Sequence, residues 1–260
     1  MTRRHLSDQR RKAIASLARR KGRQTLQLML IEGWRSVAAA LEAGAPVIEV
    51  LLTPSMAVDT AVLELLDGRQ GVVIYEITEK VARQISAVNT APGIFAVAEI
   101  GKTSVSTLHT FQTVLALDSV QDPGNVGTII RTAAWFGIDA VLGNADTADF
   151  FSPKVVRATM GGIWDTALVR EPAFVEALAA LKAAGFQLVG ADLEGTVLPK
   201  WQPADKTVLV IGGEANGISA PVQALLDDRV TIVGNQSGAG TESLNAAIAA
   251  GIIMQHWTAG

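Results

Sequence analysis

The chain has 260 residues and a formal net charge of −3, and its composition of 49% hydrophobic and 18% charged residues is that of a globular protein with a substantial core. It has no cysteine, which excludes disulfides, thiolate zinc sites and cysteine nucleophiles. Its three histidines are far apart in the sequence, and no apolar run reaches the roughly 18 residues of a membrane span. We therefore expect a cytoplasmic protein without a metal site or a membrane segment.

Helix and strand patterns alternate along the first hundred residues. Apolar residues at helical spacing predict helices over 7–20, 34–42 and 57–66, and short apolar runs predict strands over 26–32, 47–52, 72–77 and 94–100. A Ser/Thr-rich segment, Lys102–Thr113, then interrupts the pattern. We place a domain boundary there, which predicts a small α/β domain over residues 1–103 and a second domain over residues 104–260.

A second alternation of strands and helices follows this boundary. We expect strands over 114–118, 140–142, 167–170, 186–190, 207–211 and 230–233, and helices over 126–136, 153–160, 173–184 and from 243 onward. Short, continuously apolar strands separated by helices are typical of a parallel sheet that is covered on both faces. The sequence therefore predicts an α/β fold with a parallel sheet.

Positive charge is concentrated at the start of the chain. Residues 1–23 hold nine Lys or Arg residues and one acid, while the remainder is acidic. Such a basic segment can attract a polyanion such as RNA. It could instead be a solvated basic helix without a partner, or a transit peptide. A capping serine at Ser7 and an apolar face with Ile14 and Leu17 favour a folded helix. The cations that we expect to contact RNA are Arg19, Arg20, Lys21 and Arg23.

The first motif is Asp-Pro-Gly-Asn-Val-Gly, residues 122–127, which follows an apolar strand and opens a helix. Strand-to-helix turns of this kind bind ligands in α/β sheets. Asn125 could cap the helix. Arg131 lies six residues further on in an apolar run, so we expect it to be buried and to need a partner. That partner is either a ligand or an acid, of which Asp118 and Glu214 are the candidates.

Two further motifs have the same form. Residues 212–217, Gly-Gly-Glu-Ala-Asn-Gly, follow a strand but match neither a Walker A loop nor the Gly-x-Gly-x-x-Gly fingerprint of dinucleotide enzymes. Glu214 could accept hydrogen bonds from a ribose, pair with Arg131 or act as a helix N-terminal acid. Residues 243–245, Ser-Leu-Asn, begin the last helix, where Ser and Asn could serve either as caps or as ligand contacts.

Together and in this order, the three motifs resemble those of the SpoU/TrmH family of RNA ribose 2′-O-methyltransferases. The first motif matches without a gap as far as Arg131, the second matches through Gly212, Glu214 and Gly217, and the third matches at residues 243–245. The helix around residues 154–161 and the segment 30–33 are also similar, so the resemblance spans nearly the whole chain. It implies an L30e-like substrate-binding domain, followed by a SPOUT domain whose α/β sheet contains a trefoil knot.

The resemblance also implies a reaction and its residues. S-adenosylmethionine would be held by backbone groups of Gly212, Ile232 and Leu244. Arg131 would hold a phosphate and stabilise the developing alkoxide, because arginine remains protonated and is a poor base. Glu214 would orient Arg131. The side chains that would order the rest of the site are Asn125, Ser243 and Asn245. The family forms homodimers with composite active sites, and a substrate domain of this type favours ribosomal RNA over transfer RNA.

One segment departs from the family pattern. The family has Ile-Pro-Met where this chain has Ile-Val-Gly at residues 232–234, and the loop over 235–242 is longer and richer in Gly and Ser. This departure leaves open a non-catalytic RNA-binding homologue as an alternative. A dinucleotide enzyme is a second alternative, which the missing Gly-x-Gly-x-x-Gly fingerprint disfavours.

Overall fold

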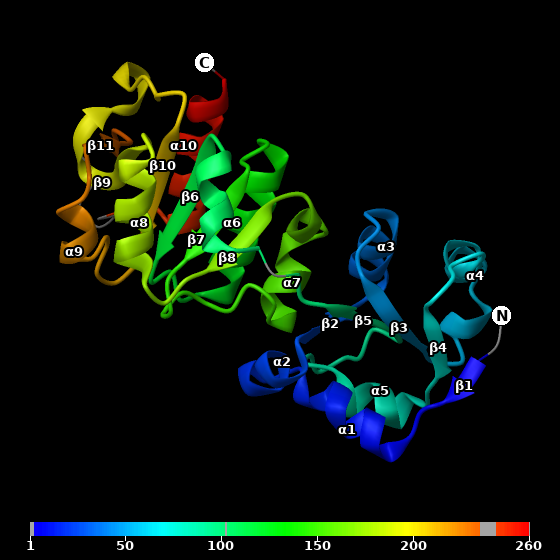
Figure 1. Ribbon diagram of the computed structural model, residues 1–260. Coiled ribbons are helices and arrows are strands. Elements are labelled where there is room, and N and C mark those ends of the chain that lie inside the picture. Colours follow the sequence, from blue (N-terminus) through cyan, green and yellow to red (C-terminus); the bar gives the residue numbers. More distant parts are fainter. Residues whose placement is uncertain (1–2, 102, 235–242, 260) are drawn as a thin grey trace. The chain divides into compact units, whose positions relative to one another are not determined.

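A computed structural model describes residues 3–101, 103–234 and 243–259, and these residues form two compact units (Figure 1). The N-terminal unit comprises the chain up to Gly101 together with Asp149–Trp164. The C-terminal unit comprises the remaining described residues. No helix within the described ranges is both long and apolar enough to cross a membrane. The second domain predicted from sequence thus includes one segment that packs with the first unit.

The N-terminal unit is built on a five-stranded mixed sheet with the order β1-β4-β3-β5-β2. β1, β4 and β3 are parallel, and β5 runs antiparallel to both β3 and β2. The strands are β1 (Arg3–His5), β2 (Leu28–Glu32), β3 (Val47–Leu52), β4 (Val73–Glu76) and β5 (Ile94–Glu99). The helices are α1 (Asp8–Ser16), α2 (Arg20–Leu26), α3 (Trp34–Glu42), η1 (Met56–Val58), α4 (Thr60–Leu66), α5 (Glu79–Ile85), α7 (Pro153–Thr159) and η3 (Gly162–Trp164).

Helices cover both faces of this sheet. Ile14, Leu17 and Ile85 bring α1 and α5 into one apolar cluster with Leu30 and Phe95. α3 covers the other face, where it contacts β2 and β5 (Figure 1). All five residues of β2 are buried, as expected for a strand that is covered on both sides.

The C-terminal unit contains a six-stranded sheet with the order β11-β9-β10-β6-β7-β8, and every strand pair is parallel. The strands are β6 (Thr113–Asp118), β7 (Ala140–Gly143), β8 (Ala167–Arg170), β9 (Gln187–Val197), β10 (Thr207–Gly212) and β11 (Asp228–Thr231). The helices are η2 (Val105–Thr110), α6 (Pro123–Trp135), α8 (Phe174–Ala183), η4 (Leu198–Lys200), α9 (Ala220–Gln223) and α10 (Ala246–Thr258). The predicted α/β fold with a parallel sheet is confirmed.

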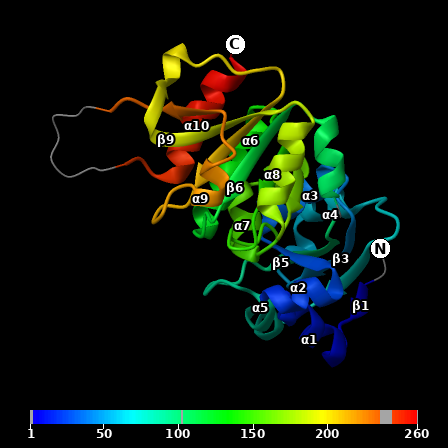
Figure 2. The ribbon, with the colours of Figure 1, turned by 60° about the vertical axis from the view of Figure 1, so that its left-hand side comes forward.

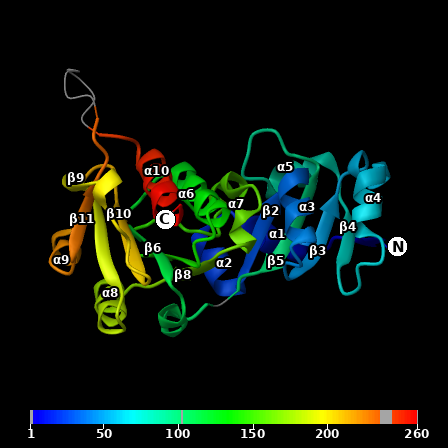
Figure 3. The ribbon, with the colours of Figure 1, turned by 90° about the horizontal axis from the view of Figure 1, so that it is seen from above.

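The sheet of the C-terminal unit lies between two helical layers. α8 covers one face, where Leu178 and Leu181 pack against Val114 and Val208. α6 and α10 pack against each other on the opposite face (Figure 2 and Figure 3). Because all six strands are parallel, their carboxyl ends share one edge of the sheet, where α/β proteins bind ligands.

Some elements differ from those predicted. The helix expected over residues 7–20 ends early, at Ser16, and a second helix that was not predicted, α2, begins at Arg20. The break falls where Arg19 is extended, and Gly22 of α2 packs against Ser16. A Cβ at Gly22 would lie only 2.1 Å from the Ser16 carbonyl oxygen, so the two helices approach as closely as glycine permits. β1 and α5 were not predicted from the sequence either. The loop over 235–242, where the chain departs from the family pattern, lies outside the described residues.

Candidate active site

The first motif forms the start of α6. Asp122 is the N-cap of this helix and its Oδ1 accepts a hydrogen bond of 2.9 Å from the Asn125 backbone N–H. Pro123 occupies the first helical position, where its missing N–H costs nothing. The prediction that Asn125 caps the helix is therefore wrong. Since Asp122 serves that purpose, the Asn125 side chain can contact other groups.

Asn125 joins the three motifs. Its Nδ2 donates a hydrogen bond to Glu214 Oε1, across 89 residues of sequence. Its Oδ1 accepts a 3.0 Å bond from Asn245 Nδ2, across 120 residues. Glu214 and Asn245 are exposed, and Asn125 is half-buried. We call these three residues the amide cluster, and its polar atoms are accessible to a ligand.

Asn245 also begins the last helix. Its Oδ1 accepts hydrogen bonds from the backbone N–H groups of Ala247, at 2.9 Å, and Ile248, at 3.3 Å. The side chain therefore caps α10 with one atom and contacts Asn125 with the other. Capping and a site contact were alternatives in the sequence, and the structure contains both. Ser243, two residues earlier, is exposed and makes no hydrogen bond with another described residue.

A buried aspartate holds the loop that carries Glu214. Asp118, at the end of β6, is 2% exposed. Its Oδ2 accepts a 2.7 Å bond from Ser219 N–H, and its backbone carbonyl accepts a 2.9 Å bond from Gly213 N–H. A Cβ at Gly213 would lie 2.4 Å from the Ser119 carbonyl oxygen, so only glycine fits there. These contacts fix both ends of the loop between β10 and α9.

Asn144 supports the same turn and was missed in the sequence. Its Nδ2 donates to Asp118 Oδ1 at 2.8 Å, and its Oδ1 accepts from the backbone N–H groups of Ser119, at 3.1 Å, and Thr147, at 2.9 Å. Ser119 has a φ of +62°, a conformation that needs such local support in a residue other than glycine. A signal was available, because Asn144 directly follows β7, the parallel neighbour of β6.

Arg131 does not occupy the environment that we predicted. It is exposed, because the buried residues of α6 are Val126, Gly127, Ile129, Ile130 and Ala133. It forms no hydrogen bond or ion pair with any other described residue. Both expected partners have other contacts, Asp118 with Ser219 and Asn144 and Glu214 with Asn125. The expected burial of Arg131 and its orientation by Glu214 are therefore wrong for this structure.

Helix geometry separates Arg131 from Asn125. At 100° per residue, six residues bring Arg131 about 120° around the axis of α6 and roughly 9 Å along it.

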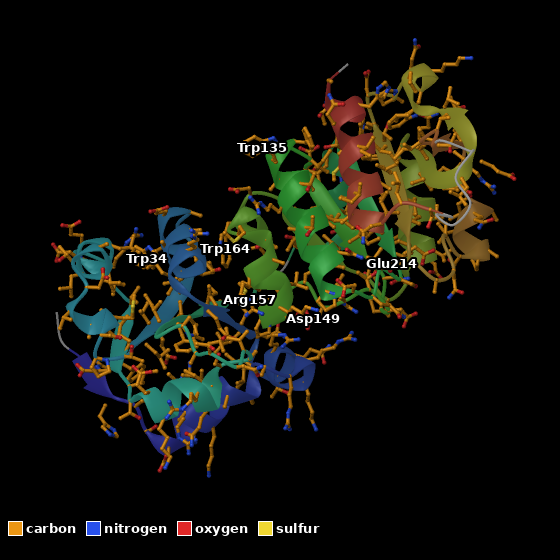
Figure 4. The ribbon with its side chains drawn as sticks, turned by 180° about the vertical axis from the view of Figure 1, so that it is seen from behind. Trp34, Trp135, Asp149, Arg157, Trp164 and Glu214 are labelled. Carbon is orange, nitrogen blue, oxygen red and sulfur yellow. The ribbon has the colours of Figure 1, made fainter. Side chains whose placement is uncertain are left out.

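An exposed apolar surface lies on α6 and α10. Its residues are Trp135 on α6, 84% exposed, Leu244 before α10, 45%, and Ile248 and Ile252 on α10, 54% and 39%. Figure 4 shows Trp135 at the C-terminal end of α6. We call these four residues the apolar patch.

The three predicted cofactor-binding positions lie at element ends. Gly212 is the last residue of β10, Ile232 directly follows β11, and Leu244 directly precedes Asn245. Because β10 and β11 are both parallel to β9, Gly212 and Ile232 lie at the same edge of the sheet. A Cβ at Gly217 would meet no atom within 4 Å, so the glycine-rich loop is open to an approaching ligand there. These features suit a cofactor that is held largely by backbone groups.

The predicted RNA-contacting cations divide into two groups. Arg19, Arg20 and Lys21 are exposed at the start of α2. Arg23 is 3% exposed, and its Nη2 lies 2.6 Å from Asp149 Oδ2 in a buried ion pair. The prediction that Arg23 contacts RNA is therefore wrong. No group of three His, Cys, Asp or Glu side chains in the described part of the chain could hold a metal ion.

Comparison with known proteins identifies the family. Residues 112–255 match the SpoU rRNA Methylase family, and residues 8–96 match the MRM3-like substrate binding domain. The chain belongs to the SpoU rRNA methylase family. It is 31% identical over 242 residues to 23S rRNA (guanosine(2553)-2'-O)-methyltransferase RlmP of Bacillus subtilis (strain 168), covering 91% of each chain. The resemblance recognised in the motifs is thereby confirmed.

Solved structures agree with this assignment. The SpoU methyltransferase AviRb from Streptomyces viridochromogenes, in complex with AdoMet, matches with a TM-score of 0.85 and 27% identity, over 96% of this chain and 97% of that one. The AdoMet-bound rRNA methyltransferase from Sinorhizobium meliloti matches with a TM-score of 0.80 and 28% identity, over 98% and 96% of the two chains. In this SpoU protein, the three motifs meet in the amide cluster of the C-terminal unit.

Proposed function

We propose that this SpoU protein transfers a methyl group from S-adenosylmethionine to a ribose 2′-hydroxyl of RNA, and that the RNA is ribosomal. The observation that carries the proposal is the meeting of Asn125, Glu214 and Asn245 at the carboxyl edge of a parallel sheet. The name of the RlmP relative, a 23S rRNA guanosine 2′-O-methyltransferase, supports both the reaction and the class of RNA. An RNA substrate also favours the predicted cytoplasmic location.

The cofactor would be held at the end of β10 and in the segments that precede α10. Backbone groups of Gly212, Ile232 and Leu244 would contact it, and two similar structures contain AdoMet. When bound, S-adenosylmethionine supplies an electrophilic methyl group on a sulfonium centre. The contribution of the chain is to bring a ribose hydroxyl in line with that methyl group and to exclude other orientations.

Residues of the C-terminal unit can stabilise the negative charge that develops on the ribose hydroxyl during methyl transfer. The hydroxyl is a poor nucleophile, so the developing charge on its oxygen must be stabilised. Arg131 carries a permanent positive charge and forms no hydrogen bond or ion pair with another described residue, so its guanidinium can bind the neighbouring phosphate and the alkoxide. Hydrogen bonds within the amide cluster fix the direction of the Asn125 and Asn245 side chains. Ser243 can hydrogen-bond to the same RNA.

The site is proposed to be completed in a homodimer. Arg131 points about 120° away from Asn125 around α6, so one copy does not direct both groups at one point. The apolar patch lies on α6 and α10, the two helices that carry these residues. Exposed apolar side chains on adjacent helices are typical of a subunit interface. Association through the patch would allow Arg131 of one protomer to serve the amide cluster of its partner.

The three exposed cations of α2 would provide the electrostatic attraction to RNA. Arg19, Arg20 and Lys21 belong to the unit that matches a substrate-binding domain. Neutralising phosphates releases counterions, so RNA affinity is expected to fall as salt increases. Transfer RNA is the alternative substrate.

The test is methyl transfer from isotope-labelled S-adenosylmethionine to unmodified 23S rRNA and to unmodified tRNA, both transcribed in vitro. Mass spectrometry of the digested RNA should find 2′-O-methylated nucleotides in the ribosomal RNA only. Arg131→Ala serves as the inactive control. Cofactor binding measured by calorimetry, together with no methylation of any RNA, would contradict the proposed reaction. Absence of cofactor binding would favour the non-catalytic RNA-binding homologue.

A further inference from the structure

A helix from the middle of the chain forms part of the N-terminal unit. α7 contacts β2, the edge strand of the five-stranded sheet. The turn after α7 contacts α3, because a Cβ at Gly161 would lie 2.8 Å from the Ala39 Cβ. In sequence, α7 falls within the SpoU match at residues 112–255, but in space it packs with the unit that matches a substrate-binding domain.

A buried ion pair connects this segment to α2. Arg23 donates to Asp149 Oδ2 from Nε, at 3.1 Å, and from Nη2, at 2.6 Å, and its Nη1 donates to the Leu17 carbonyl oxygen at 2.6 Å. The side chains of Arg23 and Asp149 are 4% and 17% exposed. Removing one partner would leave a buried charge unpaired, which is strongly unfavourable. The pair therefore fixes the start of the 149–164 segment against the basic helix α2.

Arg157 on α7 has a buried donor without a hydrogen-bond partner in the described part of the chain. The side chain is half-buried, and its Nη1 atom is buried without a hydrogen-bond partner among the described residues. A guanidinium has five N–H donors, and a buried donor without an acceptor is costly. Lys154, three residues earlier and so on the same side of α7, is exposed. Figure 4 shows Arg157 and Asp149 on this segment of the N-terminal unit.

Nη1 has almost no accessible surface, so a ligand from solvent would meet the other donors of Arg157. Nε and Nη2 form no hydrogen bond with a described residue, and together they have the chemistry of a phosphate contact. Arginine binds phosphate oxygens through two parallel N–H donors, and this geometry makes it the preferred residue for phosphates on nucleic acids. The same unit has three more exposed cations, Arg19, Arg20 and Lys21, at the start of α2. Arg23, on the same helix, forms the ion pair with Asp149. The N-terminal unit thus has basic residues on α2 and on α7, and the buried ion pair fixes α2 to the segment that leads into α7.

We propose that Arg157 binds a backbone phosphate of the substrate RNA, on a surface that α7 and α2 form together. Arg157 is a binding residue and Arg23 a positioning residue that acts through Asp149. The proposal rests on the proposed function as an RNA methyltransferase, and it deepens that function by assigning a phosphate contact to a helix outside the amide cluster.

The experiment compares Arg157→Gln, Arg157→Lys and the matched control Lys80→Gln, which removes an exposed cation from α5. The probe is unmodified 23S rRNA transcribed in vitro. Arg157→Gln should raise KM about tenfold and leave kcat nearly unchanged, because a phosphate contact contributes equally to the ground and transition states. In filter binding over a range of salt concentrations, the slope of log K against log salt should fall by about 0.7–0.9, the value of one phosphate contact.

The other measurements separate binding from folding. Arg157→Lys should restore the salt slope but only part of the affinity, because an ammonium lacks the planar fork. Calorimetric binding of S-adenosylmethionine should be unchanged in every variant, and Lys80→Gln should behave as wild type. A wild-type KM and salt slope in Arg157→Gln would overturn the proposal. So would equal losses of melting temperature, cofactor binding and RNA binding in both Arg157 variants, which would mean a structural role.

The proposed function can fail separately. If the wild type binds 23S rRNA but transfers no methyl group, the methyltransferase proposal fails, while the salt slopes of the variants still decide the role of Arg157. If the wild type binds no RNA at all, both proposals are wrong.

Discussion

The amide cluster of the C-terminal unit and the Arg23–Asp149 pair of the N-terminal unit are both polar contacts between distant segments, but they differ in burial and in purpose. The amide cluster is accessible, and two of its three residues are exposed. The Arg23–Asp149 pair is nearly closed to solvent, with side chains 4% and 17% exposed. Accessible hydrogen bonds can be exchanged for a ligand at little cost, whereas a buried ion pair keeps elements in place. The comparison separates residues that can meet a substrate from residues that hold the surface it meets.

The largest effect is expected at Arg131. Arg131→Ala should lower kcat by about 100-fold or more, the usual loss when a group that stabilises developing charge is removed. Calorimetric binding of S-adenosylmethionine should be unchanged, because the predicted cofactor positions lie on other elements. Single-turnover methyl transfer is the measurement. Wild-type turnover in this variant would remove Arg131 from the mechanism.

Breaking the Arg23–Asp149 pair tests whether this buried contact contributes more to stability than an exposed ion pair does. Asp149→Asn leaves the Arg23 charge without its carboxylate and should cost about 3–5 kcal/mol of stability. The matched control is Asp8→Asn, which breaks the Arg11–Asp8 pair, whose Asp8 side chain is 88% exposed. Exposed pairs contribute about 0–1 kcal/mol. Urea unfolding should therefore separate the two variants clearly, and equal stabilities would show that burial does not matter at Arg23.

Two substitutions at Asn245 distinguish its cap from its site contact. Asn245→Ser keeps a capping oxygen but removes the Nδ2 donor to Asn125, so thermal stability should be nearly unchanged while kcat falls. Asn245→Ala removes both and should also cost about 1 kcal/mol of stability. Thermal melts and methyl-transfer rates measured on both variants test the separation. A wild-type rate in Asn245→Ser would show that the contact with Asn125 is not needed.

The smallest effect is a pH dependence at the exposed edge of the C-terminal unit. Partial burial alone would raise the pKa of Asp227, but hydrogen bonds from Lys182 Nζ and the Leu188 N–H outweigh it and hold this pKa below its ordinary value. A lowered folded pKa stabilises the protein above the unfolded pKa, and that stability is lost as pH falls through the folded value. Asp227→Asn should therefore melt slightly lower than wild type at pH 7. The difference should shrink below about pH 4, and a difference that grows in acid would contradict this reasoning.

Features that depend on neighbouring residues in the sequence were predictable. Ser7 was expected to cap the first helix, and its side chain accepts from the Arg10 N–H. The continuous apolar run that ends at Asp118 predicted a central strand of the parallel sheet. The three motifs were identified because each joins a strand end or a helix start to polar residues, and this arrangement follows from local sequence.

Features that depend on contacts between distant segments were not predictable. Arg131 lies among apolar residues in the sequence, but the buried stripe of α6 leaves it on the outer face. Arg23 resembles its basic neighbours, and only its contact with Asp149, 126 residues away, distinguishes it as buried. α5 was missed because only three apolar residues, Val81, Ala82 and Ile85, mark its helical period.

Asn245 both caps α10 and contacts Asn125, so it connects the amide cluster to this helix. The helix that begins at this side chain also carries Ile248 and Ile252, so α10 links the amide cluster to the apolar patch. In the proposed homodimer, a rearrangement that RNA imposes on the cluster would be transmitted to the patch, and pairing of protomers through the patch would stiffen the cluster in return. By thermodynamic reciprocity, RNA would tighten self-association by the same factor by which self-association tightens RNA binding.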